Sequence, residues 1–199
     1  STYTFSSNTG YKPLATYTDA GTYTIDVTDS WGDGGITLDA YYTSAQSGVS
    51  GPVISGNDIS MSPGSSVIAT TGILVEDCAG TGINMADNFV AVPTDAIVTD
   101  GCDFIDENSE LVGGDQASTS GVVSTSGDSV TLSGTTISGF DTGVESDAGT
   151  LSVIDYATIA GASEGIWAYD TQLLINYADL DGGASGVGLV VEDSGEALM

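Results

Sequence analysis

One pattern, written three times between Ser129 and Glu192, constrains the fold of this chain more than any other feature. Apolar pairs two residues apart recur after 21 and then 22 residues, as Val130-x-Leu132, Leu151-x-Val153 and Leu173-x-Ile175. Each pair is followed by an apolar-x-Gly step and then by a Gly with an apolar neighbour. A fixed period of this length indicates a repeat architecture.

The spacing inside each repeat predicts short strands. None of the apolar segments is long enough for a helix, and the period of two places alternate side chains on one side of a strand. Coils of three strands and three turns would stack matching residues about 4.8 Å apart, because this is the distance between neighbouring strands. A single coil cannot bury its apolar side, so its neighbours complete the core. The expected inward columns are Val130, Leu151 and Leu173; Leu132, Val153 and Ile175; and Ile137, Ile159 and Leu180.

With these repeats, the chain resembles the parallel β-helix family, the right-handed solenoid shared by pectate lyases, polygalacturonases, tail spikes and many surface proteins. The resemblance covers about residues 50–199 and is clearest over 121–192. It implies an all-β fold, a right-handed parallel β-helix with about 22 residues per coil. The Asp-, Glu-, Gly- and Ser-rich stretch 106–120 is expected to bulge out as a longer loop. Because one fold hosts many functions, the resemblance does not fix an activity.

The N-terminal part follows a different pattern. Residues 1–45 are rich in aromatic and β-branched residues and predict a small antiparallel β module or a solenoid cap, with a linker at 46–52 and the β-helix at 53–199. Residues 21–34 resemble the Asp-Ser-aromatic-Gly-Asp-Gly strand-turn motif of secreted marine and microbial surface proteins.

Three carboxylates of this motif have the spacing of oxygen ligands in a Gly-rich loop. They are Asp26, Asp29 and Asp33. Ca²⁺ takes six or more oxygen ligands, and such loops supply side chains and carbonyls, so a bound Ca²⁺ is one expectation. The alternative is a tight turn in which Asp29 caps backbone amides.

Charge narrows the range of partners. The chain has 28 acidic residues and one base, Lys12, giving a net charge of −27. Nucleic acid is excluded as a partner by this charge. One interpretation is a solvated acidic surface adapted to saline surroundings, where the Debye length is short. The other is a surface that collects Ca²⁺ or similar cations. No apolar run approaches 18 residues, so no membrane span is expected.

The two cysteines, Cys78 and Cys102, lie 24 residues apart, close to one coil. Residues on adjacent coils fall within the Cα separation that a disulfide accepts. Two stacked, reduced cysteines are the alternative. The disulfide interpretation and the charge both favour an extracellular or cell-surface location.

Catalysis is not expected. Without His or Arg, no Ser-His-Asp or Cys-His set can form, and the β-helix segment has no base to serve a lyase mechanism. Four aromatic residues are candidates for a carbohydrate platform or, alternatively, for stacked packing features: Tyr156, Trp167, Tyr169 and Tyr177.

The sequence therefore favours a non-catalytic extracellular structural module of a cell-surface layer, filament or other assembly. The end of the repeats carries no closing amphipathic helix. We therefore expect either that this end contacts a partner, by self-association or through other surface-protein subunits, or that the natural chain continues. The alternative is a carbohydrate-binding or carbohydrate-processing β-helix of the tail-spike or polysaccharide-enzyme type, with glycans as ligands.

Overall fold

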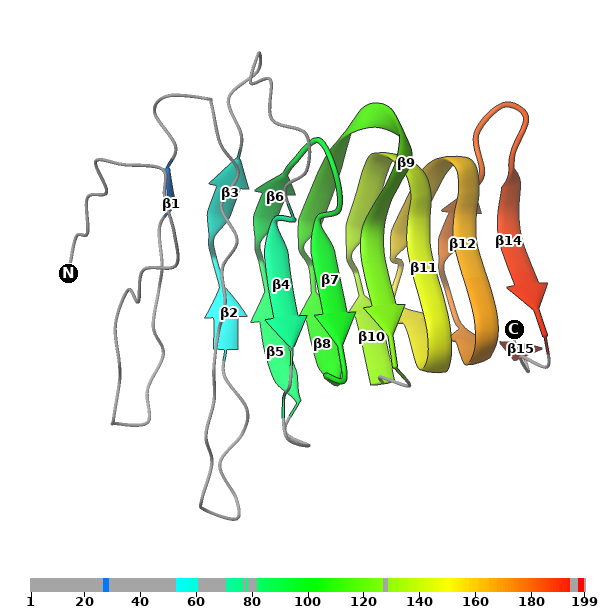
Figure 1. Ribbon diagram of the computed structural model, residues 1–199, viewed down its shortest axis with the longest axis horizontal. Coiled ribbons are helices and arrows are strands. Elements are labelled where there is room, and N and C mark those ends of the chain that lie inside the picture. Colours follow the sequence, from blue (N-terminus) through cyan, green and yellow to red (C-terminus); the bar gives the residue numbers. More distant parts are fainter. Residues whose placement is uncertain are drawn as a thin grey trace.

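In the computed structural model of this chain, the described residues are 53–60, 71–76, 78, 82–126 and 129–193, together with the backbone of 27–28 and 197–198. All regular elements among them are β-strands, with no helix. The strands form one parallel sheet that winds as a solenoid with about 22 residues per coil (Figure 1). The prediction of an all-β parallel solenoid is confirmed.

Strands are short in the first coils and long in the last, where single strands bend around corners. β9, β11 and β12 have 16, 19 and 18 residues. The strands are β1 Val27–Thr28, β2 Val53–Ser55, β3 Asp58–Ser60, β4 Ile73–Glu76, β5 Ile83–Ala86, β6 Phe89–Ala91, β7 Ile97–Asp100, β8 Phe104–Glu107, β9 Glu110–Thr125, β10 Ser129–Ser133, β11 Thr136–Ile154, β12 Thr158–Ile175, β13 Asp179–Asp181, β14 Val187–Glu192 and β15 Ala197–Leu198.

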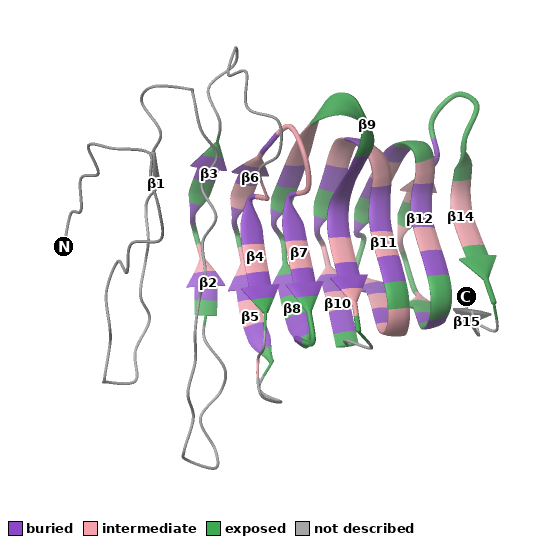
Figure 2. Ribbon diagram, in the orientation of Figure 1, coloured by how far each residue is buried: buried purple, intermediate pink, exposed green. Residues whose placement is uncertain are grey.

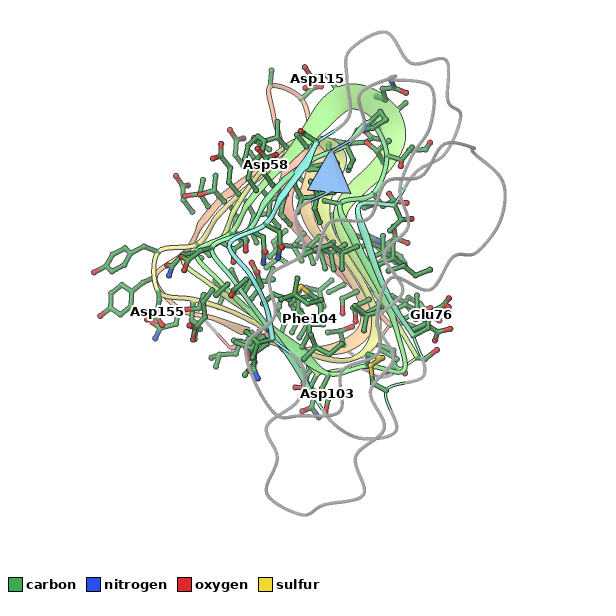
Figure 3. The ribbon with its side chains drawn as sticks, turned by 90° about the vertical axis from the view of Figure 1, so that its left-hand side faces the viewer. Asp58, Glu76, Asp103, Phe104, Asp115 and Asp155 are labelled. Atoms are coloured by element: carbon green, nitrogen blue, oxygen red, sulfur yellow. A yellow bond between two sulfur atoms is a disulfide. The ribbon has the colours of Figure 1, made fainter. Side chains whose placement is uncertain are left out.

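Each coil has three faces, numbered here in chain order. The first face contains β2, β5, β8, β10, the last parts of β11 and β12, and β15. The second contains β1, β3, β6, the first parts of β9, β11 and β12, and β13. The third contains β4, β7, the end of β9, the middle parts of β11 and β12, and β14. A view along the solenoid axis shows these faces enclosing a filled interior (Figure 3).

The pairing registers place the predicted columns together. Val130 lies opposite Leu151, which lies opposite Leu173, and all three are buried in one core cluster. Leu132 and Val153 stack in the same way, as do Ile137 and Ile159. The third members of these two columns, Ile175 and Leu180, are half-buried and pack against the same cluster. The inward columns appear as purple bands that recur from strand to strand (Figure 2).

Glycines at the corner between the second and third faces are required by the close approach of neighbouring coils. A Cβ on Gly143 would lie 2.4 Å from Ile159 Cγ2 and 2.5 Å from the Gly165 carbonyl oxygen. Gly121, one coil earlier, faces the Gly143 carbonyl in the same way, at 2.6 Å. A side chain at this corner would separate the coils, which explains why Gly recurs at the repeat period.

The prediction of a loop over 106–120 is wrong for most of its length. β8 and β9 cover most of it, and Asp106 and Leu111 are fully buried. Residues 114–118 are exposed and form the arch at the top of β9 (Figure 2). The acidic composition suggested an exposed loop, but Asp106 points into the core, where hydroxyl groups donate hydrogen bonds to its carboxylate.

The described part of the N-terminal stretch extends the solenoid. Val27 pairs with Ile59, so β1 lies parallel to β3 on the second face. These two residues therefore continue the parallel ladder and do not form an antiparallel pair. The remainder of the predicted module at 1–45 and the linker at 46–52 lie outside the described residues.

Candidate functional site

Carboxylates cover the outside of the solenoid on every side. Asp58, Glu76, Asp103, Asp115 and Asp155 point outward around the circumference, whereas Phe104 lies inside (Figure 3). Because Lys12 is the chain's single basic side chain, no acid of the described coils has a basic side chain within those coils to pair with. The acids must be stabilised by other donors.

Hydroxyl groups and backbone amides on neighbouring coils supply those donors. Asp141 accepts hydrogen bonds from the Ser163 hydroxyl at 2.6 Å and the Ser118 backbone N–H at 2.8 Å, and these bonds lower the pKa of its carboxyl. Asp95 accepts from the Ser120 backbone N–H at 2.8 Å, but burial outweighs this bond and raises its pKa. Acids on the outside thus cross-link coils without ion pairs.

Asp106 is the exception, because it occupies an inward position of the first face. It lies opposite Met85 and Leu132, in a column that is otherwise apolar. The Ser109 and Thr135 hydroxyls each donate to its carboxylate, both at 2.6 Å. Burial raises the pKa of Asp106; the two hydroxyl bonds oppose this shift, and the charges of Asp87 and Glu107 add to it.

This carboxylate ends a polar ladder at the corner between the first and second faces. The Asn57 side-chain amide donates to Asn88 Oδ1 at 2.8 Å, and Asn88 Nδ2 donates to the Ile54 carbonyl at 2.9 Å. The Asn88 backbone N–H donates to the Ser109 hydroxyl at 3.1 Å, which donates in turn to Asp106. The corner thus holds several coils in register through buried hydrogen bonds.

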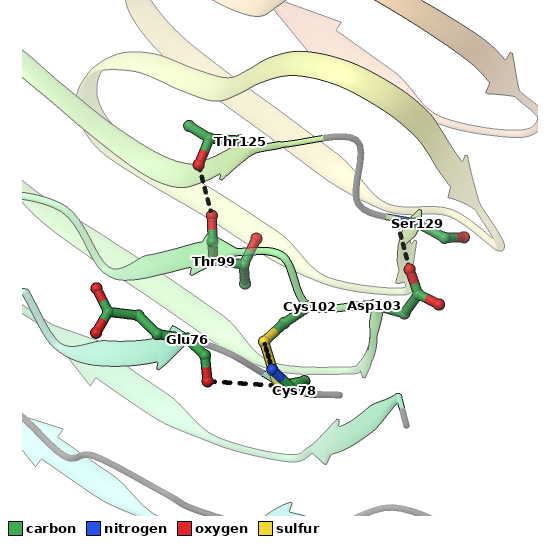
Figure 4. Close-up of a disulfide and its surroundings, with 7 residues drawn as sticks. All are labelled: Glu76, Cys78, Thr99, Cys102, Asp103, Thr125 and Ser129. Atoms are coloured by element: carbon green, nitrogen blue, oxygen red, sulfur yellow. Dashed lines mark hydrogen bonds between the residues drawn. A yellow bond between two sulfur atoms is a disulfide. The ribbon is translucent and has the colours of Figure 1, made fainter. Parts of the chain in front are cut away.

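A disulfide joins Cys78 and Cys102 at the corner between the third and first faces (Figure 4). The Cα atoms lie 5.0 Å apart, and the Cys78 backbone N–H donates to Cys102 Sγ at 3.2 Å. Cys102 is buried and Cys78 is half-buried. The bond links the connection after β4 to the connection after β7, so it ties one coil to the next.

The four aromatic residues lie in two separate pairs. Tyr156 and Tyr177 occupy the corner between the first and second faces, with ring centroids 5.8 Å apart and exposures of 80% and 70%. Trp167 and Tyr169 lie side by side on the third face, with ring centroids 6.0 Å apart and ring planes nearly parallel, at an angle of 13°. The Tyr169 hydroxyl donates to Asp193 at 2.9 Å, which raises the pKa of Tyr169.

The exposure of the first pair differs from that of an ordinary packing feature. A ring that fills a gap between coils is largely covered, whereas these two rings are mostly in solvent. The alignment of Tyr156 with Tyr177 one coil later is visible in the sequence, but their projection from the corner is not.

The predicted calcium ligands Asp26, Asp29 and Asp33 lie outside the described residues, and this site stays a prediction. Over 53–60, 71–76 and 82–193, apart from 127–128, no three His, Cys, Asp or Glu residues converge in a way that could hold a metal ion. The described part of the chain also contains no helix long and apolar enough to cross a membrane.

Comparisons with known protein families, with curated proteins and with solved structures find no match to this chain.

Proposed function

We propose that this chain is a non-catalytic structural module of an extracellular assembly, such as a surface layer or filament. The observation that carries the proposal is the combination of a stacked-strand rod with an exterior on which acids are cross-linked by hydroxyls and amides and meet no base. A rod of this kind spaces or joins other subunits through its rigidity.

The mode of stabilisation supports this role. Inward columns run continuously from β2 to the last coils, and the polar ladder and the disulfide add links between coils. Such repeats are stabilised by interfaces with their nearest neighbours, so a longer stack keeps its shape along its whole length.

An extracellular location is supported by the disulfide and by the charge. Disulfides persist in oxidising compartments, and one closes between coils here. A net charge of −27 repels copies of the chain at low ionic strength, and salt of marine strength screens this repulsion. Assembly is therefore expected where salt or divalent cations are abundant.

Non-catalytic character is supported by the chemistry of the titratable groups. Among the described residues, the two carboxyls with a raised pKa are Asp95, which accepts a hydrogen bond from a backbone amide, and Asp106, which is enclosed in the core. A general acid must reach its substrate, and a fully buried carboxyl at an inward strand position has no such access.

Carbohydrate binding is the second candidate function, and the exposed pair Tyr156 and Tyr177 favours it. Aromatic rings in solvent offer flat apolar surfaces for sugar rings, and Asp155 beside them offers a hydrogen-bond acceptor.

The structural role is tested on the full chain by electron microscopy and analytical ultracentrifugation over a range of NaCl and CaCl₂ concentrations. Rods that associate end to end or side by side as salt rises would support the proposal. Particles that stay monomeric under every condition, together with turnover of any polysaccharide in a hydrolysis panel, would reject it.

The role of Ca²⁺ is tested separately by thermal unfolding. A bound ion stabilises by mass action, so the melting temperature should rise with CaCl₂ beyond the effect of NaCl at matched ionic strength. Equal effects of the two salts would reduce the contribution of Ca²⁺ to screening. The variant Asp29→Asn provides the control for the predicted loop.

A further inference from the structure

The corner between the first and second faces changes in its last two coils. Two residues connect the paired positions Ser133 and Thr136, whereas three connect Ile154, the partner of Ser133, to Thr158. The corner after Ile154 therefore carries one extra residue, and the last corner returns to the earlier length, because three residues connect Ile175 to Asp179 just as three connect Leu132 to Thr136. In these corners the residues with left-handed backbone include Tyr156 and Tyr177, with φ of 66° and 54°.

A tyrosine is an unusual residue for this backbone conformation. Earlier coils use residues that tolerate it, because Gly has no Cβ and Asn and Asp bond locally to the backbone. Those residues are Gly56, Asp87, Asn108 and Gly134. By the pairing register, Asp155 and then Tyr177 follow Gly134 at this position, and Tyr156 is the inserted residue beside it. Both tyrosines therefore take a left-handed conformation that their Cβ opposes.

Within the chain, a smaller residue would lose the contact between the two rings, whose centroids lie 5.8 Å apart, but it would keep the backbone bond that fixes this corner. The bond that fixes this corner runs from the Tyr156 backbone N–H to the Tyr177 carbonyl at 2.7 Å, and any residue other than proline could make it. The side chains are 80% and 70% exposed, so they add little to the core. Strained backbone conformations of this kind cluster at ligand-binding and other functional sites.

Charge decides what kind of partner fits these rings. Asp155 is exposed at the same corner, and its Oδ2 accepts a hydrogen bond from the Ser133 hydroxyl at 3.1 Å. Asp179 is exposed just beyond Tyr177, at the start of β13. The nearby acids meet no base in the described coils, so an anionic partner is repelled, a neutral one gains nothing from the field, and a cationic one is attracted.

The geometry of the pair also suits a cation. A Lys or Arg head group interacts with an aromatic face within about 6 Å of the ring centroid. Because the Tyr156 and Tyr177 centroids are 5.8 Å apart with planes tilted by 31°, one planar guanidinium can lie within that reach of both rings. The same guanidinium can then bond to the Asp155 carboxylate.

We propose that the corner formed by Asp155, Tyr156 and Tyr177 is a docking site for an Arg-bearing segment of a partner protein in the assembly. The inference rests on the proposed structural function, because it names the kind of partner that suits a subunit with a single base. A second copy of this chain fits poorly as the partner, since Lys12 is its single base and its net charge is −27.

The test measures peptide binding to the full chain by calorimetry in 150 mM NaCl, where general attraction to the acidic surface is screened. The probe is a Gly/Ser peptide with spaced arginines. The control peptide has citrulline in place of each arginine, because citrulline has the same shape without the charge. Four proteins are compared: the unchanged chain, Tyr156→Asn with Tyr177→Asn, Tyr156→Phe with Tyr177→Phe, and the control Val187→Ala, which removes an exposed apolar side chain elsewhere.

We expect the double Asn variant to bind the arginine peptide about tenfold more weakly, since it loses both rings and keeps every charge. It should fold at least as well as the unchanged chain, because Asn suits the left-handed backbone. The double Phe variant keeps both rings and should bind within about twofold of the unchanged chain, as should Val187→Ala. The citrulline peptide should bind weakly to all four.

Equal binding of the arginine peptide to the unchanged chain and the double Asn variant overturns the proposal, and so does the absence of binding to the unchanged chain. Binding of neutral oligosaccharides that is lost in the double Asn variant, with arginine binding unaffected, assigns the corner to sugars instead. The proposed function fails on a different result, polysaccharide turnover without assembly, so the two failures can be told apart.

Discussion

Replacing Asp106 by Asn is expected to stabilise the folded chain at neutral and alkaline pH and to have little effect in acid. Asp106 is fully buried opposite Met85 and Leu132, and burial raises its pKa above the usual 3.8. A carboxyl whose folded-state pKa is raised binds its proton more tightly in the folded state than in the unfolded state. Its stability contribution is therefore complete below about pH 3.8 and is lost as the pH rises through the raised pKa.

The magnitude follows from the groups around the carboxylate. An ionised group in such a site costs several kcal/mol of desolvation, and two charge-assisted hydrogen bonds return about 1.5–3 kcal/mol each. No basic side chain is present in the described coils to stabilise the Asp106 carboxylate further, and the charges of Asp87 and Glu107 destabilise it.

The Asn side chain can keep the network intact. The Ser109 hydroxyl still donates to the side-chain oxygen, and the new amide can donate to the Thr135 hydroxyl. That hydroxyl can then donate to the backbone carbonyl of residue 106, which is already 3.3 Å away. Two neutral bonds at about 1 kcal/mol each, without the desolvated charge, give a net gain on the order of 1–2 kcal/mol at pH 8.

The measurement is urea unfolding of both proteins from pH 3 to pH 9, with circular dichroism as the signal. The difference in the free energy of unfolding should grow from near zero at pH 3 to its full value at pH 8. In thermal melts the same gain would raise the melting temperature by about 2–4 °C per kcal/mol.

Asp141→Asn provides the matched control with the opposite sign. Bonds from Ser163 and Ser118 lower the pKa of Asp141, so its stabilising effect is present above its unfolded pKa and lost as the pH falls. This variant should be slightly less stable at pH 8. If Asp106→Asn were also less stable at pH 8, with the pH profile of the unchanged chain, then the hydroxyl bonds would outweigh burial and the reasoning for Asp106 would be wrong.

Three further experiments test the disulfide, a buried hydroxyl and the close approach of neighbouring coils. Replacing Cys78 and Cys102 together by Ser should lower the free energy of unfolding by about 2–4 kcal/mol in chemical denaturation, and an unchanged value would show that the disulfide constrains little. Thr99→Val should raise the free energy of unfolding by about 1 kcal/mol in the same assay, because the buried Thr99 hydroxyl has no hydrogen-bond partner among the described residues. A lower free energy of unfolding would show that this hydroxyl does have a partner, such as a buried water. Gly143→Ala should lower the free energy of unfolding by about 1–3 kcal/mol, because the added Cβ would clash with the next coil. Gly82→Ala should lower it less, because its added Cβ would lie 3.6 Å from the nearest atom. Equal losses in the two variants would show that the close approach of the coils is not the reason for glycine at position 143.

The regular half of the fold could be predicted because its side chains repeat in register. Val130, Leu151 and Leu173 stand 21 and then 22 residues apart, and a period of two within each strand predicts which side faces inward. Nothing else in the sequence is needed to place them in one column.

The earlier coils were harder to predict because their intervals vary. Ile54 pairs with Met85 after 31 residues and Phe104 pairs with Val130 after 26, so no constant offset aligns them. Asp106 then looks like part of an acidic loop, because its partners Ser109 and Thr135 are ordinary small polar residues that gain meaning only when the coils stack.

The site at the tyrosine corner was predicted in part. The sequence shows that Tyr156 and Tyr177 align, but it does not show the backbone conformation that turns them outward. A count of residues between the paired columns could have revealed the insertion, because Ile154 to Thr158 is one residue longer than Ser133 to Thr136. The separation of Trp167 and Tyr169 onto another face follows from the winding of the coil, which a linear pattern does not display.

The earlier coils, with variable intervals, and the later coils, with nearly constant intervals, keep their strands in register by different means. Variable intervals place longer connections between paired strands, and ordering those connections costs conformational entropy. The polar ladder from Asn57 to Thr135 and the disulfide both lie in the earlier coils, whereas the corner of the later coils is filled by Ala157 and Ala178. A slip of one residue along a strand turns every side chain to the other face, and in the first face it would expel Asp106 from its hydroxyl partners. The bonds from Ser109 and Thr135 to Asp106 form only in the native register, so the polar ladder helps to specify the register even though the charge of Asp106 costs stability at neutral pH.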